Sequence, residues 1–486
     1  MPSSDDHAGQ PVLAVVGAGL AGLVAGVRAA ELGVRVVVLE SGSAQRYPSN
    51  SRYTGGVFHL AFHDITAPPD DLFEALSDAA AGFSDPSLLR VLADDAARCI
   101  EWLTAHGAEF GQGGSAEWMS RMLVPFSLQT PGFRDHWPDK GAERLLQCLE
   151  ALLAGHGGEL RRGMRARGLS TVDGRVTGVR VIADGGSETE VVADAVVVAD
   201  GGFAGNAELV ERYISPAPEK LCRRGAGTGL GDGMLMAKEA GARLAHMDRF
   251  YGHVQCAEAV RDDALWPYPI LDLVASSALV VGPDGRRFAD EGLGGVAMAN
   301  AIAALPDPLS AFVVMDSNVW EGKGRDFLLP PNPTLVERGV TLYSAPDVAG
   351  LAELIGVPAD ALQTTVTDFE EARAGQRLDL LDPPRTSAPS TLASGADPIR
   401  TPPFLAIRLA AGITYTMGGI VIDTGARALR EDGTAVRGLY AAGSATTGFE
   451  GGPRSVYLGG LAKAAIFGLR AAETVVRDIA ATAGVL

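Results

Sequence analysis

The sequence is poor in cysteine and has no long apolar run, and each absence excludes a class of protein. The four cysteines are widely separated and show no paired spacing, so neither a zinc site nor a disulfide framework is indicated. They are Cys99, Cys148, Cys222 and Cys256. No stretch reaches about 18 uninterrupted apolar residues, the minimum for a helix that spans a membrane. We therefore expect no metal site and no integral membrane segment.

Basic residues are scarce as well. With 41 Lys and Arg against 59 Asp and Glu, the formal net charge is −18. Nucleic acids and anionic membranes require a basic surface, so neither is an expected partner. The first residues, MPSSDDHAGQPV, are acidic and polar where a secretory signal has a basic region before an apolar one. These features, with cysteines that fit a reducing compartment, predict a cytoplasmic protein that acts on a small molecule.

Glycine and apolar residues, by contrast, are abundant. The chain has 61 glycines among 486 residues, and 47% of its residues are hydrophobic. This composition is typical of a globular α/β protein with many tight turns. The length favours about two or three hydrophobic cores.

Residues 11–40 predict a strand, a helix and a second strand. The apolar run Val12–Val16 is followed by a glycine-rich turn and an Ala-rich stretch that continues to Leu32. Gly33 then ends the helix, and the second strand covers residues 34–39.

The glycine-rich turn in this unit is a GxGxxG fingerprint. Gly17, Gly19 and Gly22 directly follow the first strand and open the helix, which is the context that a dinucleotide site requires. Glycines let the backbone N–H groups and the helix N-terminus approach a pyrophosphate. Glu40 ends the second strand about 18 residues beyond Gly22, where its carboxylate can accept the ribose hydroxyls.

Two later segments repeat the pattern of a buried strand that ends in glycine. They cover residues 196–202 and 438–443. The glycines at the ends of such strands let a ligand approach the backbone closely at the carboxyl edge of the sheet, where α/β folds bind ligands.

With the fingerprint, these segments resemble the FAD domain of the fumarate reductase and succinate dehydrogenase flavoprotein superfamily, which includes the 3-ketosteroid dehydrogenases. Tyr53–Gly56 resembles the glycine turn near the flavin ring, and residues 229–242 resemble the family's GDG helix. Residues 285–291 are similar to its cap segment RFxxE. Thr416–Gly419 matches its TMGG, and Leu458–Gly460 matches the LGG that opens its last helix.

The resemblance implies an α/β fold in which a Rossmann-type FAD-binding domain is discontinuous. Residues 1–245 and 405–486 would form this domain, and residues 246–404 an inserted α+β capping domain. FAD would be bound non-covalently, since no His occupies the turn at Tyr53–Gly56 in the manner of the respiratory members. The expected cofactor-binding residues are Gly17, Ala18, Gly19, Ala21, Gly22, Glu40, Ser41, Thr54, Gly55, Gly56, Ala166, Ala199, Asp200, Gly201, Asp232, Gly443, Ser444, Gly459, Gly460, Leu461 and Ala462.

The sequence departs from the family where fumarate reductases hold and protonate a dicarboxylate. Gly295 stands at the position that we align with the family's proton-donating Arg. Thr414 and Tyr415 replace two His residues that precede TMGG. His253 does fall where the family has a substrate-facing His.

The segment before the last helix allows two alignments. Counting forward from Gly443 places Arg454 at the family's substrate-binding Arg, whereas counting back from Leu458–Gly460 places Tyr457 there. An arginine would bind a carboxylate or a carbonyl oxygen. A tyrosine hydroxyl could hydrogen-bond a ketone and stabilise its enolate, as in the ketosteroid dehydrogenases. The candidate catalytic residues are Tyr457, Arg454, Tyr415, His253 and Tyr251.

These residues predict an FAD-dependent oxidoreductase that acts on CH–CH groups of a small carbonyl compound, by α,β-dehydrogenation or by the reverse double-bond reduction. Two alternatives stay open at this point. One is a fumarate reductase-like reductase of an unsaturated carboxylic acid, with Arg454 as the carboxylate anchor. The other is a catalytically inactive flavin-binding or electron-carrier protein. The electron acceptor, the substrate and the oligomeric state do not follow from the sequence.

Overall fold

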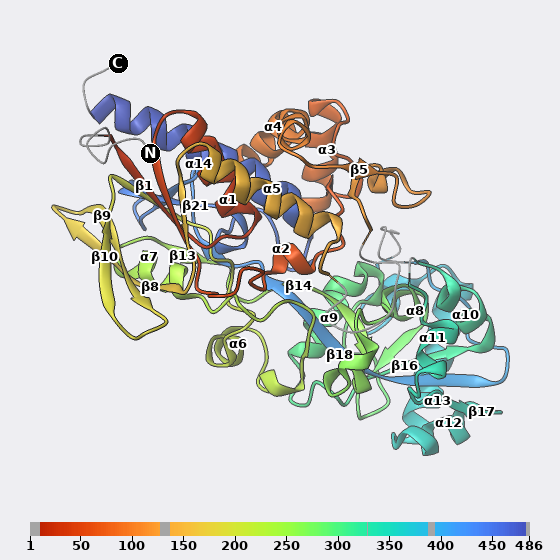
Figure 1. Cartoon of the computed structure of the whole chain (residues 1–486). Helices are drawn as coiled ribbons and strands as arrows, with labels where there is room; N and C mark the ends of the chain where they lie inside the picture. The colour runs from red at the N-terminus through yellow and green to blue at the C-terminus, as the bar shows by residue number, and fades with distance from the viewer. Residues whose placement is uncertain (1–9, 127–136, 328, 387–393, 483–486) are drawn as a thin grey trace.

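A computed structural model of the chain describes residues 10–126, 137–327, 329–386 and 394–482. Its described strands form one nine-stranded sheet, one six-stranded sheet and three two-stranded pairs. Figure 1 shows these sheets in two lobes, with the first and last parts of the chain together in one lobe and the middle of the chain in the other.

The nine-stranded sheet has the order β10-β9-β21-β11-β1-β2-β7, with β20 beside β21 and β8 beside β9. Strands β2, β1, β11 and β21 run parallel, with Val15 paired to Val38 on one side and to Val197 on the other. The strands are β1 (Val12–Val16), β2 (Arg35–Leu39), β7 (Glu159–Arg161), β8 (Met164–Val172), β9 (Arg175–Ala183), β10 (Glu188–Val192), β11 (Ala195–Val198), β20 (Arg427–Leu429) and β21 (Ala435–Ala441).

Apolar residues on both faces bury the centre of this sheet. Helix α1 (Leu20–Glu31) packs between α14 (Gly460–Thr482) and α5 (Gly141–Gly155), and α14 also contacts α4 (Pro86–Ala105). Figure 1 shows α14, at the end of the chain, lying beside α1, at its beginning. A parallel sheet needs such cover because its strands expose apolar side chains on both faces. The described ends of the chain therefore share one core.

The six-stranded sheet is organised around the long strand β18 (Phe404–Thr416). β18 pairs with β12 in parallel and with β14, β16 and β17 antiparallel. The other strands are β12 (Cys222–Arg223), β14 (Phe250–Cys256), β15 (Leu279–Val281), β16 (Phe312–Asp316) and β17 (Tyr343–Ala345). The two-stranded pairs are β3 (His59–Leu60) with β4 (His63–Asp64), β5 (Phe110–Gly111) with β6 (Met122–Leu123), and β13 (Leu244–Ala245) with β19 (Gly419–Ile420).

The remaining described α-helices connect or cover these sheets. They are α2 (Asn50–Tyr53), α3 (Pro69–Ala80), α6 (Ala207–Tyr213), α7 (Asp232–Glu239), α8 (Asp272–Ser277), α9 (Gly295–Ala303), α10 (Ser317–Glu321), α11 (Pro331–Glu337), α12 (Val348–Ile355) and α13 (Ala359–Ala374). Within the described residues, no helix is long and apolar enough to cross a membrane.

The predicted α/β fold with a strand, helix, strand start is confirmed. β1 covers the predicted run Val12–Val16, and β2 lies within the strand predicted over residues 34–39. The domain limits at 245/246 and 404/405 stay a prediction. Two strands on the FAD side of these limits, β12 and most of β18, pair within the second sheet.

Candidate functional site

A cavity of about 550 Å³ opens where the carboxyl ends of the parallel strands meet the second sheet. Sites for small molecules and cofactors have volumes of roughly 300–1,000 Å³. We call the part lined by residues 17–20 and 40–41 the glycine end, and the part lined by Tyr251, Tyr415 and Tyr457 the tyrosine end.

Close backbone packing shapes the glycine end. Gly17 has φ +96°, and a Cβ there would lie 2.6 Å from the Asp200 Cα atom. A Cβ at Gly22 would lie 2.0 Å from the Gly17 carbonyl oxygen. At Gly19 a Cβ would meet only the Ser51 hydroxyl oxygen, at 3.2 Å. Gly17 and Gly22 thus allow strand and helix to pack closely, whereas Gly19 keeps space free in the cavity.

The N-terminus of α1 is available for an anion at this end. Its N-cap, Gly19, has no side chain to accept the first N–H groups. The Leu20 N–H donates to the Ser51 hydroxyl at 3.0 Å. Free N–H groups and the positive end of the helix dipole favour phosphate.

Glu40 holds the glycine turn in place. Its carboxylate accepts from the Ala18 N–H at 3.1 Å and from the Gly42 N–H at 2.7 Å. The side chain lines the cavity, and its burial raises the pKa of the carboxyl group. Glu40 therefore fixes the turn that follows β1 as well as facing a ligand.

Asp200 presents an unpaired oxygen beside this turn. One carboxylate oxygen accepts from the Gly233 N–H at 2.7 Å, whereas Oδ1 is buried and has no hydrogen-bond partner in the described part of the chain. Burial raises the pKa of Asp200 to about 7. Asp232 lines the same wall and pairs with Arg165 at 2.6 Å. A buried acceptor without a donor indicates a ligand that supplies a hydroxyl or N–H group.

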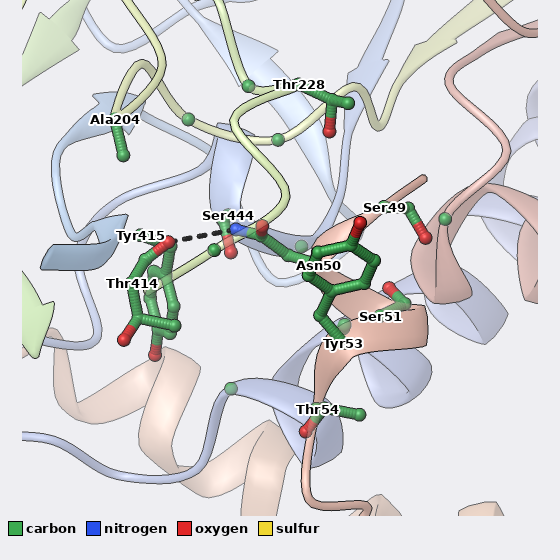
Figure 2. A pocket seen from close by; sticks show the side chains of 18 of the residues that line it. Ser49, Asn50, Ser51, Tyr53, Thr54, Ala204, Thr228, Thr414, Tyr415 and Ser444 are labelled. Carbon is green, nitrogen blue, oxygen red and sulfur yellow. Dashed lines mark hydrogen bonds between the residues drawn. The ribbon is translucent and has the colours of Figure 1, made fainter. Parts of the chain in front are cut away.

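Asn50 connects the two ends of the cavity. Figure 2 shows its side chain pointing to Thr414, and its amide donates to the Thr414 carbonyl at 3.0 Å. The Asn50 carbonyl accepts from the Ala226 N–H at 2.8 Å. A short helix, α2, thereby positions the segment that follows β12 against β18.

Three tyrosines from separate elements meet at the other end. The Tyr251 and Tyr457 rings stack with centroids 3.8 Å apart, and the Tyr415 ring lies 5.3 Å from that of Tyr251. The Gly460 N–H, at the start of α14, donates to the Tyr457 hydroxyl at 3.3 Å. Burial raises the pKa of Tyr251 to about 12 and raises those of Tyr415 and Tyr457 well above the usual value. All three hydroxyls are therefore protonated at neutral pH.

A buried ion pair fixes the loop that carries Tyr457. The Glu450 carboxylate contacts the Lys463 ammonium at 2.5 Å and accepts from the Tyr415 hydroxyl at 3.0 Å. It also accepts from the Leu458 N–H at 3.0 Å. Breaking a buried pair leaves an uncompensated charge, so this network holds the approach to α14 firmly.

Tyr251 begins a chain of hydrogen bonds that leads away from the cavity. Its hydroxyl lies 3.0 Å from His253 Nε2, and His253 Nδ1 lies 2.6 Å from Asp272 Oδ2. Burial lowers the pKa of His253, so the imidazole is neutral at pH 7. A neutral His253 that donates to Asp272 accepts the Tyr251 hydroxyl proton with its other nitrogen. The arrangement can pass a proton from Tyr251 to His253.

Asp272 fills the space beside Gly295. A Cβ at Gly295 would lie 1.9 Å from the Asp272 carboxyl carbon. Any side chain at this position, which we aligned with the family's acid Arg, would displace the carboxylate that holds His253. Position 295 therefore carries no proton-donating side chain, and the groups that can transfer a proton here are Tyr251 and His253.

The FAD binding domain family model matches residues 13–455. The chain belongs to this family. It is 28% identical to "Fumarate reductase (cytochrome)" of Shewanella frigidimarina, over 90% of this chain and 72% of that protein. It is 30% identical to "4-oxocyclohexanecarboxylate 2-dehydrogenase" of Sinomonas cyclohexanicum, over 56% of this chain and 49% of that protein.

Among solved structures, a 3-ketosteroid Δ4-(5α)-dehydrogenase from Rhodococcus jostii RHA1 superposes with a TM-score of 0.71. The match covers 96% of this chain and 97% of that one at 23% identity. At this identity the likeness concerns the fold, and it confirms the predicted FAD-binding architecture.

FAD is the cofactor of this family member, and the cavity fits it. The α1 N-terminus at Gly19 suits a pyrophosphate, and the unpaired Oδ1 of Asp200 suits a hydroxyl. Within the described residues, no cluster of His, Cys, Asp or Glu could hold a metal ion.

The structure places most of the predicted cofactor residues on the cavity wall. These are Gly17, Ala18, Gly19, Ala21, Glu40, Ser41, Thr54, Gly55, Ala166, Ala199, Asp200, Gly201, Asp232, Gly443, Ser444, Gly460 and Leu461. Gly22, Gly56, Gly459 and Ala462 do not line it. Gly22 and Gly459 instead pack against backbone. A Cβ added at Gly459 would lie 2.2 Å from the His59 carbonyl oxygen.

Of the five candidate catalytic residues, four line the cavity: Tyr251, His253, Tyr415 and Tyr457. Arg454 is exposed and does not line it. The turn that Glu450 fixes presents Tyr457 to the cavity instead.

Sequence reasoning missed several residues of the wall. Asn50 and Ser51 connect elements far apart in the chain, and Arg224 brings a positive charge to the cavity. The rings of His59 and Phe62 pack against Tyr457 at the tyrosine end, with Trp118 against Phe62, and Trp266, Ile270 and Phe327 also line the cavity. The sequence signal for Asn50 is its place shortly before the predicted glycine turn at Tyr53–Gly56.

Proposed function

We propose that this FAD-dependent oxidoreductase acts on a CH–CH group next to a ketone, with dehydrogenation as the favoured direction. The observation that carries the proposal is the meeting of three protonated tyrosines with the start of α14 at one end of the cavity. Its relatives support the reaction class, since their names are those of reductases and dehydrogenases of such bonds.

The ketone oxygen is held by Tyr457 and the beginning of α14. The Tyr457 hydroxyl is protonated, and Gly460 and Leu461 line the same wall. Donors aimed at a carbonyl oxygen stabilise the negative charge that develops when the α proton leaves. The helix N-terminus adds positive potential at this point.

The α proton leaves through Tyr251. Its hydroxyl oxygen takes the proton while its own proton passes to His253 Nε2, and Asp272 stabilises the imidazolium that forms. Bound FAD supplies the acceptor for the hydride from the β carbon. The substrate thus loses one proton and one hydride and gains a double bond conjugated with the ketone.

The cavity suits a ketone better than fumarate. A dicarboxylate must be held at both ends and protonated by a positioned donor. Asp272 fills the space beside Gly295, and Arg454, the anchor in the reductase alternative, lies outside the cavity. The assembled hydrogen-bond chain from Tyr251 also favours an enzyme over an inactive carrier.

The test is anaerobic mixing of the holoenzyme with a panel of cyclic ketones while the flavin absorbance is recorded. We expect bleaching with at least one ketone, and slow turnover of fumarate with a chemically reduced dye. Rapid fumarate reduction without any ketone oxidation contradicts the proposal. A flavin that neither substrate class oxidises or reduces supports the carrier alternative.

A further inference from the structure

Arg224 is a cation in the cavity that the reaction described above does not use. It follows β12 directly, and its backbone N–H donates to the Ile413 carbonyl of β18 at 2.8 Å. Its side chain passes over Gly412, where an added Cβ would lie 2.6 Å from Arg224 Cδ. The guanidinium Nη1 donates to the Thr414 hydroxyl at 3.2 Å. Gly412 thus leaves room for the arginine to reach the cavity wall.

This guanidinium has no carboxylate partner within the part of the chain that the structure describes. Its Nε is buried and makes no hydrogen bond. Arg52, also in the interior, instead contacts both Glu143 and Glu150. A half-buried arginine without a counterion in so acidic a chain indicates an anion that comes from outside the protein.

Arg224 lies near the tyrosines. Burial raises the pKa of Tyr251 and lowers that of His253, and the charge of Arg224 opposes the first shift and adds to the second, so the cation lies within electrostatic range of both. In β18, Gly412 is paired with His253 on one side and with Cys222 on the other. The arginine and the imidazole therefore approach the cavity from neighbouring strands across β18.

The anion could be a carboxylate of the substrate or a phosphate of FAD, and the position favours the substrate. The α1 N-terminus at Gly19 already offers a phosphate site at the opposite end. Thr414, which Arg224 contacts, precedes Tyr415 of the tyrosine end.

We propose that Arg224 binds a carboxylate of the substrate, so that the substrate class is an oxo acid in which an apolar ring separates ketone and carboxylate. The proposal rests on the proposed function for the ketone and adds the second anchor. Tyr457 would hold the ketone, Arg224 the carboxylate, and Trp266 and Phe327 would cover the ring between them. A guanidinium matches a carboxylate in charge and geometry.

The first experiment measures binding without catalysis. Cyclohexanecarboxylate, which has no ketone, is titrated into the oxidised holoenzyme, and the flavin spectrum reports its dissociation constant. We expect Arg224→Gln to weaken binding by about 10- to 100-fold, the effect of losing a charged hydrogen bond. Arg286→Gln, an exposed arginine outside the cavity wall, is the matched control and should bind as the wild type does.

The second experiment compares 4-oxocyclohexanecarboxylate with its neutral methyl ester. Wild type should prefer the acid in kcat/KM, and Arg224→Gln should lose that preference mainly through a higher KM for the acid. Equal carboxylate binding by wild type and Arg224→Gln, or loss of binding in Arg454→Gln alone, overturns the inference. Loss of FAD from Arg224→Gln assigns the arginine to the phosphate and also overturns it. If carboxylate binding depends on Arg224 but no ketone is oxidised, the inference about Arg224 holds and the proposed function is wrong.

Discussion

The two ends of the cavity are built by different means. At the glycine end, backbone groups of one local turn face the ligand, and side chains such as Glu40 serve to hold that turn. At the tyrosine end, side chains from β14, β18 and the loop before α14 meet, and a buried ion pair holds them. Ligand binding at the glycine end depends on glycines, whose missing side chains leave space. The function of the tyrosine end depends on the hydroxyl groups of particular tyrosines. Substitutions at the two ends should therefore fail in different ways.

The largest expected effect is loss of FAD from Gly19→Val. Among the described residues a Cβ at this position meets only the Ser51 hydroxyl, so the chain should fold, but the side chain occupies the ligand space. We expect flavin content to fall below about a tenth of that of the wild type. The ratio of flavin to protein absorbance measures it, with circular dichroism as the check on folding. Gly155→Val, at a position with open space, is the control and should retain its flavin. A Gly19→Val protein with full flavin contradicts the assignment of this end.

At the tyrosine end, Tyr457→Phe should leave FAD bound and reduce turnover. It removes the hydroxyl near Gly460 while keeping the ring that stacks on Tyr251. We expect kcat to fall by roughly 100-fold or more, the usual effect of losing an oxyanion donor. Tyr213→Phe, outside the cavity wall, is the matched control. Unchanged turnover in Tyr457→Phe would remove this residue from the chemistry.

Asp272→Asn tests the proton path by its pH dependence. The relay requires a neutral His253, whose pKa burial lowers, so activity should be complete at neutral pH and be lost on acidification through a pKa below the ordinary value of 6.5. The Asp272 charge raises that pKa against the effect of burial. The variant should therefore move the acid limb of the rate profile to lower pH and reduce kcat by about 10- to 100-fold. A merely structural role predicts a lower rate with an unmoved acid limb.

The smallest expected effect is that of Glu40→Gln at the glycine end. The amide retains one acceptor for the Ala18 and Gly42 N–H groups but loses the charge. We expect the dissociation constant of FAD to rise by about 5- to 30-fold, equivalent to about 1–2 kcal/mol. Titration of the apoprotein with FAD measures it, and kcat at saturating FAD should be unchanged. A large fall in kcat would mean that this end also takes part in the chemistry.

Prediction from sequence reached the glycine end in detail because its parts are local. The fingerprint, β1 and Glu40 lie within about 30 residues, and periodicity and glycine spacing indicate them directly. At the other end the sequence supplied candidates but could not choose between Arg454 and Tyr457. That choice depends on Glu450, which holds Lys463 and the turn between them.

The sequence by itself determined the family, the cofactor and the Rossmann-type start of the fold. Each of these is indicated by short motifs whose local geometry follows from the spacing of glycines and strands. Tertiary structure alone decided which side chains share the cavity. It joined Tyr251 to His253 and Asp272, placed that carboxylate beside Gly295, and left Arg224 without a counterion among the described residues. The physical reason is that burial and pairing arise from contacts between residues far apart in the chain, which no local pattern encodes.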